Sequence, residues 1–441
     1  MSTETRHTLQ TELQSVRLAS RQLSRAIGEA KQAGSNVTTL VEQKKRFSTR
    51  ERELMSLISE AIYSPSTGLQ GAATIAADTV HHEHDAASDV PSDTDDLEAT
   101  EVELASTTDW PAWDEFVKHQ PGASVYHLSG WRTVIQKSFG HDCPYLIAKR
   151  SDRVVGVLPL VRMQSRLFGH FMVSVPYFNY GGALAADKQA KAALLAQASA
   201  MTLTNHCNHL ELRGTEPLPD WPARSDKVSM WLRLPANADQ LWQFLGSKLR
   251  AQIKKTHAKG LQYETGGIEL LDEFYRVFSI NMRDLGTPVY AKTFFAHVVN
   301  LAPGQITLVI GRDSCARPVS AALLVLHQGR MEVPWASTLR RANELNANMG
   351  LYWHMLQYAC QQGCHTFDFG RSTQGASTYR FKKQWGAEPV QLQWHYWLAG
   401  GGDLPKLNPD NPKYRAAIAV WQKLPVWATR LLGPMIVRNI P

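Results

Sequence analysis

The residues best suited to chemistry gather in one stretch, residues 367–397, which reads FDFGRSTQGASTYRFKKQWGAEPVQLQWHYW. It contains one carboxylate, Asp368, next to apolar residues. Arg371 follows in a polar segment, and Lys382 and Lys383 then stand among aromatic residues. A buried strand that leads into a polar loop with cations suits a ligand that is anionic or carries a carbonyl group.

The elements that position these residues follow from local patterns. Residues 366–369 are expected to form a short strand that Gly370 ends, followed by a polar loop. After Gly386 and Pro389, alternating apolar residues from 390 to 396 predict a second strand with one buried face.

Length and charge set the class of protein. With 441 residues the chain can form two or three domains with full cores. The formal charge is +7, but residues 64–108 contain ten acidic residues and no Lys or Arg, so the remainder carries about +17. This balance favours polyanionic partners such as phosphates, RNA or an acidic membrane surface, without choosing among them.

The cysteines and histidines give no metal or disulfide pattern. Five scattered cysteines do not form a disulfide scaffold, and Cys360 and Cys364 have no matching pair for zinc. The cluster His81, His82 and His84 is expected to be solvated. The polar N-terminus and the lack of a long apolar run predict a reduced, cytoplasmic location and no bound metal.

Residues 1–63 predict two helices joined near Gly34, each with an apolar seam at heptad spacing, and so an antiparallel coiled-coil hairpin. Its many cations suit either a solvated surface or a nucleic-acid contact. Residues 64–108 are too poor in apolar residues for a core and predict a disordered acidic linker.

The next two segments repeat one order of elements. Residues 109–235 read as helices, a hairpin, a helix from 187 to 205 and a strand. Residues 236–399 read as helices, a three-stranded meander, a helix from 349 to 362 and the stretch at 366–397. The fold class is therefore α+β, with two similar domains of mixed sheets that face each other across a cleft.

The tail, residues 400–441, predicts two helices with an apolar stripe beside Lys423 and Arg430. Such a stripe either docks on the protein core or lies on a membrane surface, and the sequence leaves both open.

Four strings carry a family resemblance: SKLRAQIKKTHAKGL, NMRDLGTPVYAKTFF, ANMGLYWHMLQYACQQGCHTFDFGRS and YRFKKQWGAEP. In this order they resemble the Fem-type peptidyltransferases of the GNAT superfamily, and more closely the FemAB-like proteins of exosortase and PEP-CTERM gene clusters. The resemblance covers residues 109–397. It implies tandem GNAT-like domains that transfer an aminoacyl or acyl group to an amine or hydroxyl in cell-envelope or exopolysaccharide synthesis.

The resemblance also implies roles for single residues. Lys382, in the FK motif, matches the lysine at the transferred carbonyl group, with Lys383 as its substitute; packing of the stem on neighbouring rings is the structural alternative. Tyr379 is expected to relay a proton or to be a core tyrosine, and Asp368 to orient a cation or to be structural. The expected substrate-binding residues are Arg371, Tyr177, Asn179, Tyr180, Arg250, Lys254, Lys255 and Trp385.

The donor is expected to be aminoacyl-tRNA, with acyl-CoA as the alternative. Many GNAT enzymes bind CoA at an (R/Q)xxGx(G/A) turn, but the matching segment here, NELNANMGLYW, has only Gly350 of that motif. In addition, LSRAIGEAKQAG in the hairpin resembles the tRNA-binding arm of seryl-tRNA synthetases, which favours seryl-tRNA.

The sequence therefore predicts a cytoplasmic Fem-type aminoacyl- or acyltransferase, with possible peripheral contact with the inner membrane face through the tail. The protein is expected to hold no tightly bound cofactor, to contact tRNA through residues 1–63 and to use a lipid-linked or nucleotide-linked glycan as acceptor. Two alternatives remain, an acyl-CoA-dependent N-acyltransferase and an inactive coiled-coil adaptor. The acceptor, the donor and the oligomeric state are left open.

Overall fold

The computed structural model describes residues 12, 15, 19, 22, 23, 26, 27, 29, 30, 36–47, 49, 50, 99–165, 169–218, 220–401, 404, 405 and 412–440. They belong to two compact units, Met1–Ser92 and Asp93–Pro441. In the first unit residues 38–47 are helical, and Arg50 Nη2 lies 2.8 Å from Glu12 Oε1. Most of the predicted heptad seams, the acidic segment 64–98 and its histidines lie outside the described residues, so the coiled coil and the linker stay predictions.

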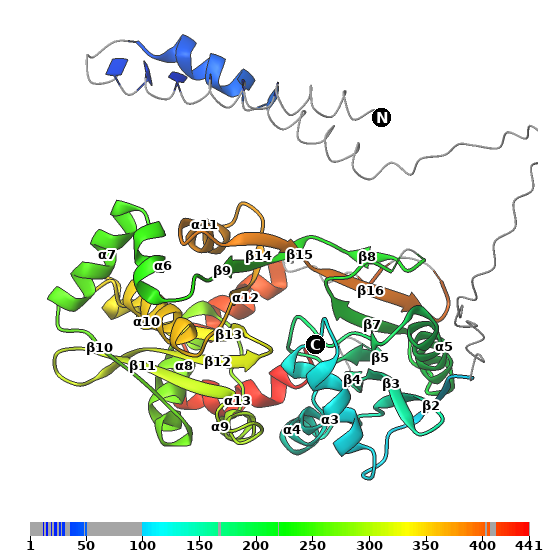
Figure 1. Cartoon of the computed structure of the whole chain (residues 1–441). Helices are drawn as coiled ribbons and strands as arrows, with labels where there is room; N and C mark the ends of the chain where they lie inside the picture. Colours follow the sequence, from blue (N-terminus) through cyan, green and yellow to red (C-terminus); the bar gives the residue numbers. More distant parts are fainter. Residues whose placement is uncertain are drawn as a thin grey trace, which may run out of the picture. The chain divides into compact units, whose positions relative to one another are not determined.

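The second unit alternates helices and strands (Figure 1). Its helices are α3 (Trp110–His119), α4 (Gly130–Phe139), α5 (Lys188–Thr204), α6 (Ala238–Phe244), α7 (Ser247–Ala258), α8 (Leu271–Leu285), α9 (Lys292–Val299), α10 (Ala347–Gln361), α11 (Ser377–Gln384), α12 (Pro412–Trp421) and α13 (Val426–Val437). Its strands are β1 (Glu101–Leu104), β2 (Leu146–Arg150), β3 (Arg153–Leu158), β4 (Leu160–Ser165), β5 (Gly169–Ser174), β6 (Leu184–Ala185), β7 (His209–Gly214), β8 (Ala223–Arg224), β9 (Lys227–Arg233), β10 (Gln262–Gly266), β11 (Ile306–Arg312), β12 (Pro318–His327), β13 (Arg330–Thr338), β14 (Thr366–Thr373), β15 (Glu388–Gln391) and β16 (Gln393–Leu398).

The strands form three sheets. Their orders are β1-β2-β3-β6, β4-β5-β7-β16-β8 and β10-β11-β12-β13-β14-β9-β15. The seven-stranded sheet is mixed, because β13 and β14 pair in parallel while its other pairs are antiparallel. The predicted α+β class, with mixed sheets flanked by helices, is confirmed.

The seven-stranded sheet is covered on both faces. Along β11, Leu308 and Ile310 pack in one apolar core with residues of α8 and α9, whereas Val309 packs in a second core with residues of α7 and α10. The same alternation continues along β12. Strands that are buried on both faces have continuous apolar sequences, so these strands could be recognised from the sequence. The predicted meander of β11, β12 and β13 is confirmed.

The two halves exchange strands. Strand β9 precedes the predicted boundary at residue 235 but pairs with β14 and β15 in the seven-stranded sheet. Strand β16 is the last strand of the predicted second half, residues 236–399, but it pairs with β7 in the five-stranded sheet. One apolar core also runs through both halves and includes Trp131, Phe178, Phe274 and Phe294. The predicted boundary stays a prediction, and strands cross it in both directions.

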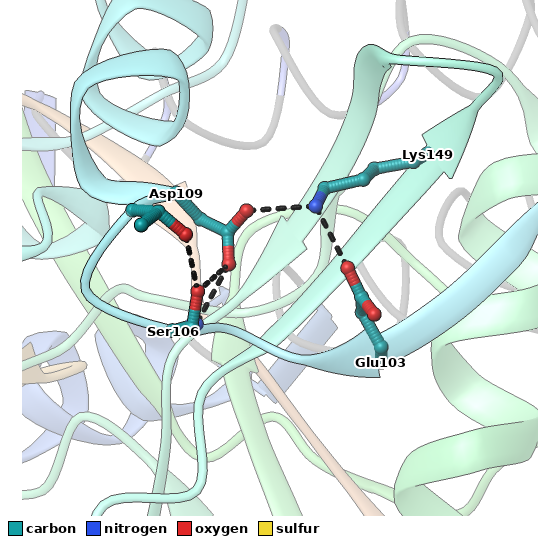
Figure 2. A network of polar contacts seen from close by, with 5 residues as sticks. Glu103, Ser106, Asp109 and Lys149 are labelled. Atoms are coloured by element: carbon teal, nitrogen blue, oxygen red, sulfur yellow. Dashed lines mark hydrogen bonds and ion pairs between the residues drawn. The ribbon is translucent and has the colours of Figure 1, made fainter.

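Strand β1 lies inside the segment predicted as linker. It pairs antiparallel with β2, and Lys149 Nζ lies 2.7 Å from both Glu103 Oε1 and Asp109 Oδ1 (Figure 2). Burial alone would raise the pKa of Asp109, but hydrogen bonds from Lys149 and Ser106 outweigh it and lower this pKa to about 2. These pairings order residues 101–108, although their composition resembles that of the preceding acidic segment.

Three predicted elements are interrupted. The strand expected through residues 153–163 divides at Pro159, which has no N–H to donate, and its parts join different sheets. The helix expected over 238–260 divides at Gly246, whose backbone is extended. The strand expected over 390–396 divides at Leu392 into β15 and β16. The apolar alternation predicted a strand there but carried no information about its partners.

Strand β14 is longer than predicted. Gly370 does not end it: the strand continues to Thr373, and its register with β9 shifts between Asp368 and Arg371. Gly370 has a φ of +75°, which a residue with a side chain rarely adopts. The glycine therefore makes an irregular step inside the strand. Residues 371–373, expected in the polar loop, belong to β14, and α11 begins at Ser377.

Candidate active site

A pair of buried carboxyl groups lies in the middle of the seven-stranded sheet. Asp368 on β14 is in register with Glu332 on β13 and with Trp231 on β9. Asp368 is fully buried and Glu332 is 5% exposed. Because residues in register on neighbouring strands project to the same face, these three side chains share one side of the sheet.

Asp368 is the centre of a hydrogen-bonded network. Its Oδ2 accepts from Tyr180 OH at 2.5 Å and from Trp231 Nε1 at 2.9 Å. Its Oδ1 accepts from Ser229 Oγ at 2.6 Å and from the Gly370 backbone N at 2.8 Å. Four donors directed at two oxygens are the partners that an ionised carboxylate requires when buried.

Glu332 is in the opposite situation. Burial, together with the charge of Asp368, raises the pKa of Glu332 to about 8, although Arg330 and Lys382 act against the rise. Glu332 therefore holds a proton at neutral pH. The guanidinium carbon of Arg330 lies 5.0 Å from the ring centroid of Trp231, which ties this cation to the same network.

We expect Glu332→Gln to reduce the pH dependence of stability. A carboxyl group with a raised folded-state pKa keeps its proton between pH 4.5 and about 8, where the unfolded chain has lost it, so stability falls as the pH rises through this range. Relative to wild type, the variant should gain about 1 kcal/mol or more between pH 5 and pH 9 in urea unfolding. Exposed Glu388→Gln is the matched control. Parallel pH profiles for wild type and Glu332→Gln would contradict this assignment.

Lys382 is a buried cation at the edge of this network. It lies on α11, which packs on β14 and β9, and it is 8% exposed. Its Nζ donates to the carbonyl oxygens of Gly370 and Arg371, both at 2.9 Å. Burial lowers the pKa of Lys382 to about 8, and Asp368 limits this fall. Among the residues that the structure describes, its third ammonium hydrogen has no partner.

The other residues predicted around Lys382 have different surroundings. Lys383 is exposed, with Nζ 5.8 Å from the ring centroid of half-buried Tyr379. Trp385 is 2% exposed and packs against Phe369 and Phe381, so its ring is part of the core. The structure thus separates the two adjacent lysines, with only Lys382 turned inward.

Arg371 leaves β14 on the outside of the molecule. Its side chain is exposed, and its guanidinium carbon lies 5.0 Å from the ring centroid of Trp394 on β16. The buried Arg213 lies 4.2 Å from the centroid of the same ring. Arg371 therefore reaches toward the five-stranded sheet, at the place where the exchanged strand joins the two halves.

The predicted PYFNYGG segment is only partly in the network. Tyr180 is in it, whereas Tyr177 OH hydrogen-bonds with His141 Nε2 at 3.0 Å and with the Arg438 carbonyl at 3.2 Å. Tyr177 has a φ of +77°, an uncommon conformation for a residue with a bulky side chain. Asn179 is half-buried between them.

The predicted basic residues of α7 lie on another surface. Arg250 is half-buried and Lys254 and Lys255 are exposed. Helix α7 packs on α10. No hydrogen bond or ion pair among the described residues joins these cations to Lys382 or Asp368.

A cavity of about 450 Å³ opens beside the network. Of the site residues predicted from the sequence, Tyr180 lines this cavity. Trp231, Arg330 and Arg213, which were not predicted, line it as well. The cavity is also bordered by Gly182, where an added Cβ would lie 3.0 Å from the Arg213 carbonyl oxygen. Tyr180 and Trp231 thus connect the cavity directly to Asp368, whereas Lys382 lies outside the lining.

Four residues of this site were not identified from the sequence: Ser229, Trp231, Arg330 and Glu332. The first two lie on β9, which was not predicted as a strand. A usable signal was present for Glu332, because a carboxyl residue inside the apolar run MEVPWA, two residues after an arginine, is unusual for a strand that is buried on both faces.

Comparisons with known proteins identify the fold. Residues 246–383 match the family described as acetyltransferase (GNAT) domain. The crystal structure of FemX superposes with a TM-score of 0.50 and 15% identity, covering 67% of this chain and 96% of FemX. Together, the family match and this likeness confirm the predicted GNAT-like α+β fold.

Two further structures match at lower TM-scores. A tandem GNAT protein from the clavulanic acid biosynthesis pathway has a TM-score of 0.44 and 12% identity, covering 69% of this chain and all of that protein. L-PGS from Bacillus licheniformis has a TM-score of 0.46 and 10% identity, covering 75% of this chain and 98% of that protein. No curated protein sequence matches the chain. The exosortase and PEP-CTERM link stays a prediction.

Proposed function

We propose that this protein is an aminoacyl- or acyltransferase in which Lys382 stabilises the oxyanion formed at the transferred carbonyl. The observation that carries the proposal is the buried ammonium group of Lys382, which two backbone carbonyls hold in place within the segment that matches the GNAT family. With two hydrogens so engaged, the third can donate to a substrate oxygen.

In this reaction an amine or hydroxyl of the acceptor attacks the activated carbonyl carbon. The new bond forms as the carbonyl π electrons move to oxygen, and the bond to the donor oxygen or sulfur then breaks. A fixed cation in a dry site lowers the energy of the intermediate by several kcal/mol (about 3). The attacking group must lose a proton, and Tyr180, hydrogen-bonded to Asp368 at the cavity wall, is placed to accept it while passing its own to Asp368.

The start of α10 favours a donor other than CoA. By the family resemblance Gly350 corresponds to the turn at which GNAT enzymes bind the pyrophosphate, but a Cβ there would come within 2.1 Å of Tyr263 OH. Tyr263 OH donates to the Ala347 carbonyl at 3.0 Å. This glycine therefore makes room for a tyrosine rather than for a phosphate, which supports the proposal that the donor is aminoacyl-tRNA, with seryl-tRNA the first to test.

The cavity supports an acceptor that carries phosphate. Four cations line it, Arg330, Arg213, Lys188 and Lys191, against two carboxylates, Asp187 and Glu216, of which Glu216 pairs with Lys191 at 2.8 Å. Guanidinium and ammonium groups are the usual partners of phosphate oxygens. We therefore propose a lipid-linked or nucleotide-linked glycan as acceptor, in cytoplasmic cell-envelope or exopolysaccharide synthesis.

The test is transfer of labelled amino acid from a charged tRNA pool to a lipid-linked or nucleotide-linked glycan fraction. We expect transfer that ribonuclease abolishes. Transfer from acetyl-CoA without tRNA would instead support the acyl-CoA-dependent alternative. A lack of turnover with every donor, together with capture of a protein partner by residues 1–63, would support the adaptor.

The contribution of the N-terminal arm, residues 1–63, to tRNA binding can be measured in the full chain. Lys45 and Arg46 are exposed on its described helix, so Lys45→Gln with Arg46→Gln should weaken tRNA binding about tenfold and reduce the salt slope of log Kd by about 1 to 2. Glu42→Gln on the same helix removes an acidic group instead and should not weaken binding. Unchanged affinity in the double variant would remove the arm from tRNA recognition.

A further inference from the structure

Helix α13 presents large apolar side chains to solvent. Trp427, Leu431 and Met435 are 69%, 66% and 66% exposed, and they recur every four residues. This spacing places them on one side of the helix. Leu432 and Ile436 widen the stripe and are 42% and 38% exposed. An apolar face of this extent on a surface helix indicates a contact with something outside the described chain.

The opposite side of α13 is firmly docked. Ala428, Thr429, Gly433 and Val437 are buried, and the helix packs on α8. An added Cβ at Gly433 would lie 2.7 Å from the backbone N and O of Val289, so the two backbones are in close contact. The helix is thus held in place with its apolar stripe facing outward.

Charge identifies the occupant of this face. Residues 411–441 contain five basic residues and no acidic one: Lys413, Arg415, Lys423, Arg430 and Arg438. Lys423 and Arg438, just before and just after α13, are exposed. Basic residues that flank an apolar helical face are the pattern of helices that lie in the interface of an anionic bilayer. A second copy of the same face would bring these like charges together.

We propose that α13 binds the surface of a bilayer containing anionic lipid, lying parallel to the membrane plane with Trp427, Leu431 and Met435 among the acyl chains. Helix α13 has 12 residues, too few to cross a bilayer, so the contact is interfacial. None of the helices among the described residues has the length and apolar character of a membrane span. Such a contact would bring the site to lipid-linked molecules, but the inference does not depend on the proposed reaction.

The experiment is flotation of the full chain with phosphatidylcholine vesicles, with and without phosphatidylglycerol. We expect binding that requires phosphatidylglycerol. Leu431→Gln with Met435→Gln should lower the partition coefficient about tenfold or more, because both side chains lose apolar contact. Lys423→Gln with Arg438→Gln should lower it by a similar factor.

Phe244→Ser is the matched control. Phe244 is 78% exposed on α6, which lies well apart from α13 in Figure 1, so its loss should leave vesicle binding unchanged. Unfolding midpoints equal to that of wild type show that each variant is folded. Equal binding to vesicles of phosphatidylcholine alone would overturn the proposal. So would a dimer in the absence of vesicles that Leu431→Gln dissociates, or vesicle binding that is unaffected by all α13 variants.

Discussion

Replacing Lys382 with methionine is expected to lower kcat/KM for acyl transfer by about 10² to 10³ while the protein remains folded. Methionine keeps most of the volume of the lysine stem but removes the ammonium group. In a site without water, loss of one oxyanion donor has an effect of this size on the rate. Stability should change little, because the variant loses two hydrogen bonds to the Gly370 and Arg371 carbonyls but also removes a buried charge.

Lys383→Met is the matched control for this variant. It makes the same chemical change at the adjacent position, but Lys383 is exposed. The measurement is initial rate against donor concentration for both variants, with urea unfolding alongside. Equal losses in the two variants, or near-normal turnover in Lys382→Met, would remove Lys382 from the chemistry.

The pH profile gives an independent check on the same group. With its pKa lowered to about 8, Lys382 is charged below this pH and becomes neutral above it. If the ammonium form stabilises the oxyanion, kcat/KM should decline on the alkaline side near pH 8. The fall should be absent from the residual activity of Lys382→Met.

The individual elements of the fold could be predicted from the sequence, but the pairing between its halves could not. Helix α8 and the meander of β11, β12 and β13 follow from local periodicity, which depends only on nearby residues. The exchange of β9 and β16 depends on which distant strand offers a free edge. Residues 390–396 alternate apolar and polar side chains with a period of two. This pattern is the same whether β15 and β16 join one sheet or two different sheets.

In the site, too, residues of one local stretch could be predicted from the sequence, but their distant partners could not. Lys382 and Asp368 were identified from a stretch of sequence, but their neighbours Ser229 and Trp231 come from β9, some 140 positions earlier. The burial of Lys382 depends on α11 lying over β14. The carbonyl groups of Gly370 and Arg371 that accept from Lys382 lie at the irregular step in β14, where the register with β9 shifts. Neither property can be read from residue types.

The pairing of Asp368 with Glu332 explains how the site can hold several charges in a dry interior. Asp368 is hydrogen-bonded by four donors, while the raised pKa of Glu332 keeps that group neutral at pH 7. Lys382 and Arg330 then supply positive charge near a single buried negative charge. The residues that stabilise the core of the sheet are therefore the same ones that set the electrostatics of the site.

Asp368→Asn should accordingly be the variant that affects stability most. The oxygen of the introduced amide could still accept from Ser229 and the Gly370 N–H, but the amide N–H groups would face the donors of Tyr180 and Trp231. The loss of two charge-assisted bonds, which leaves the Trp231 N–H with only the Tyr180 hydroxyl at 3.2 Å as acceptor, costs about 2 to 4 kcal/mol. Urea unfolding measures this loss, and exposed Asp220→Asn is the control.

The same variant makes a prediction about the two neighbouring groups. The charge of Asp368 raises the pKa of both Glu332 and Lys382, so its removal should lower both. The alkaline fall in kcat/KM should then begin below pH 8, and less of the Lys382 population should be charged at pH 7. An unchanged profile together with wild-type stability would mean that Asp368 does not control the charge of Lys382. A shifted profile with lower stability is the combination that the observed hydrogen bonds require.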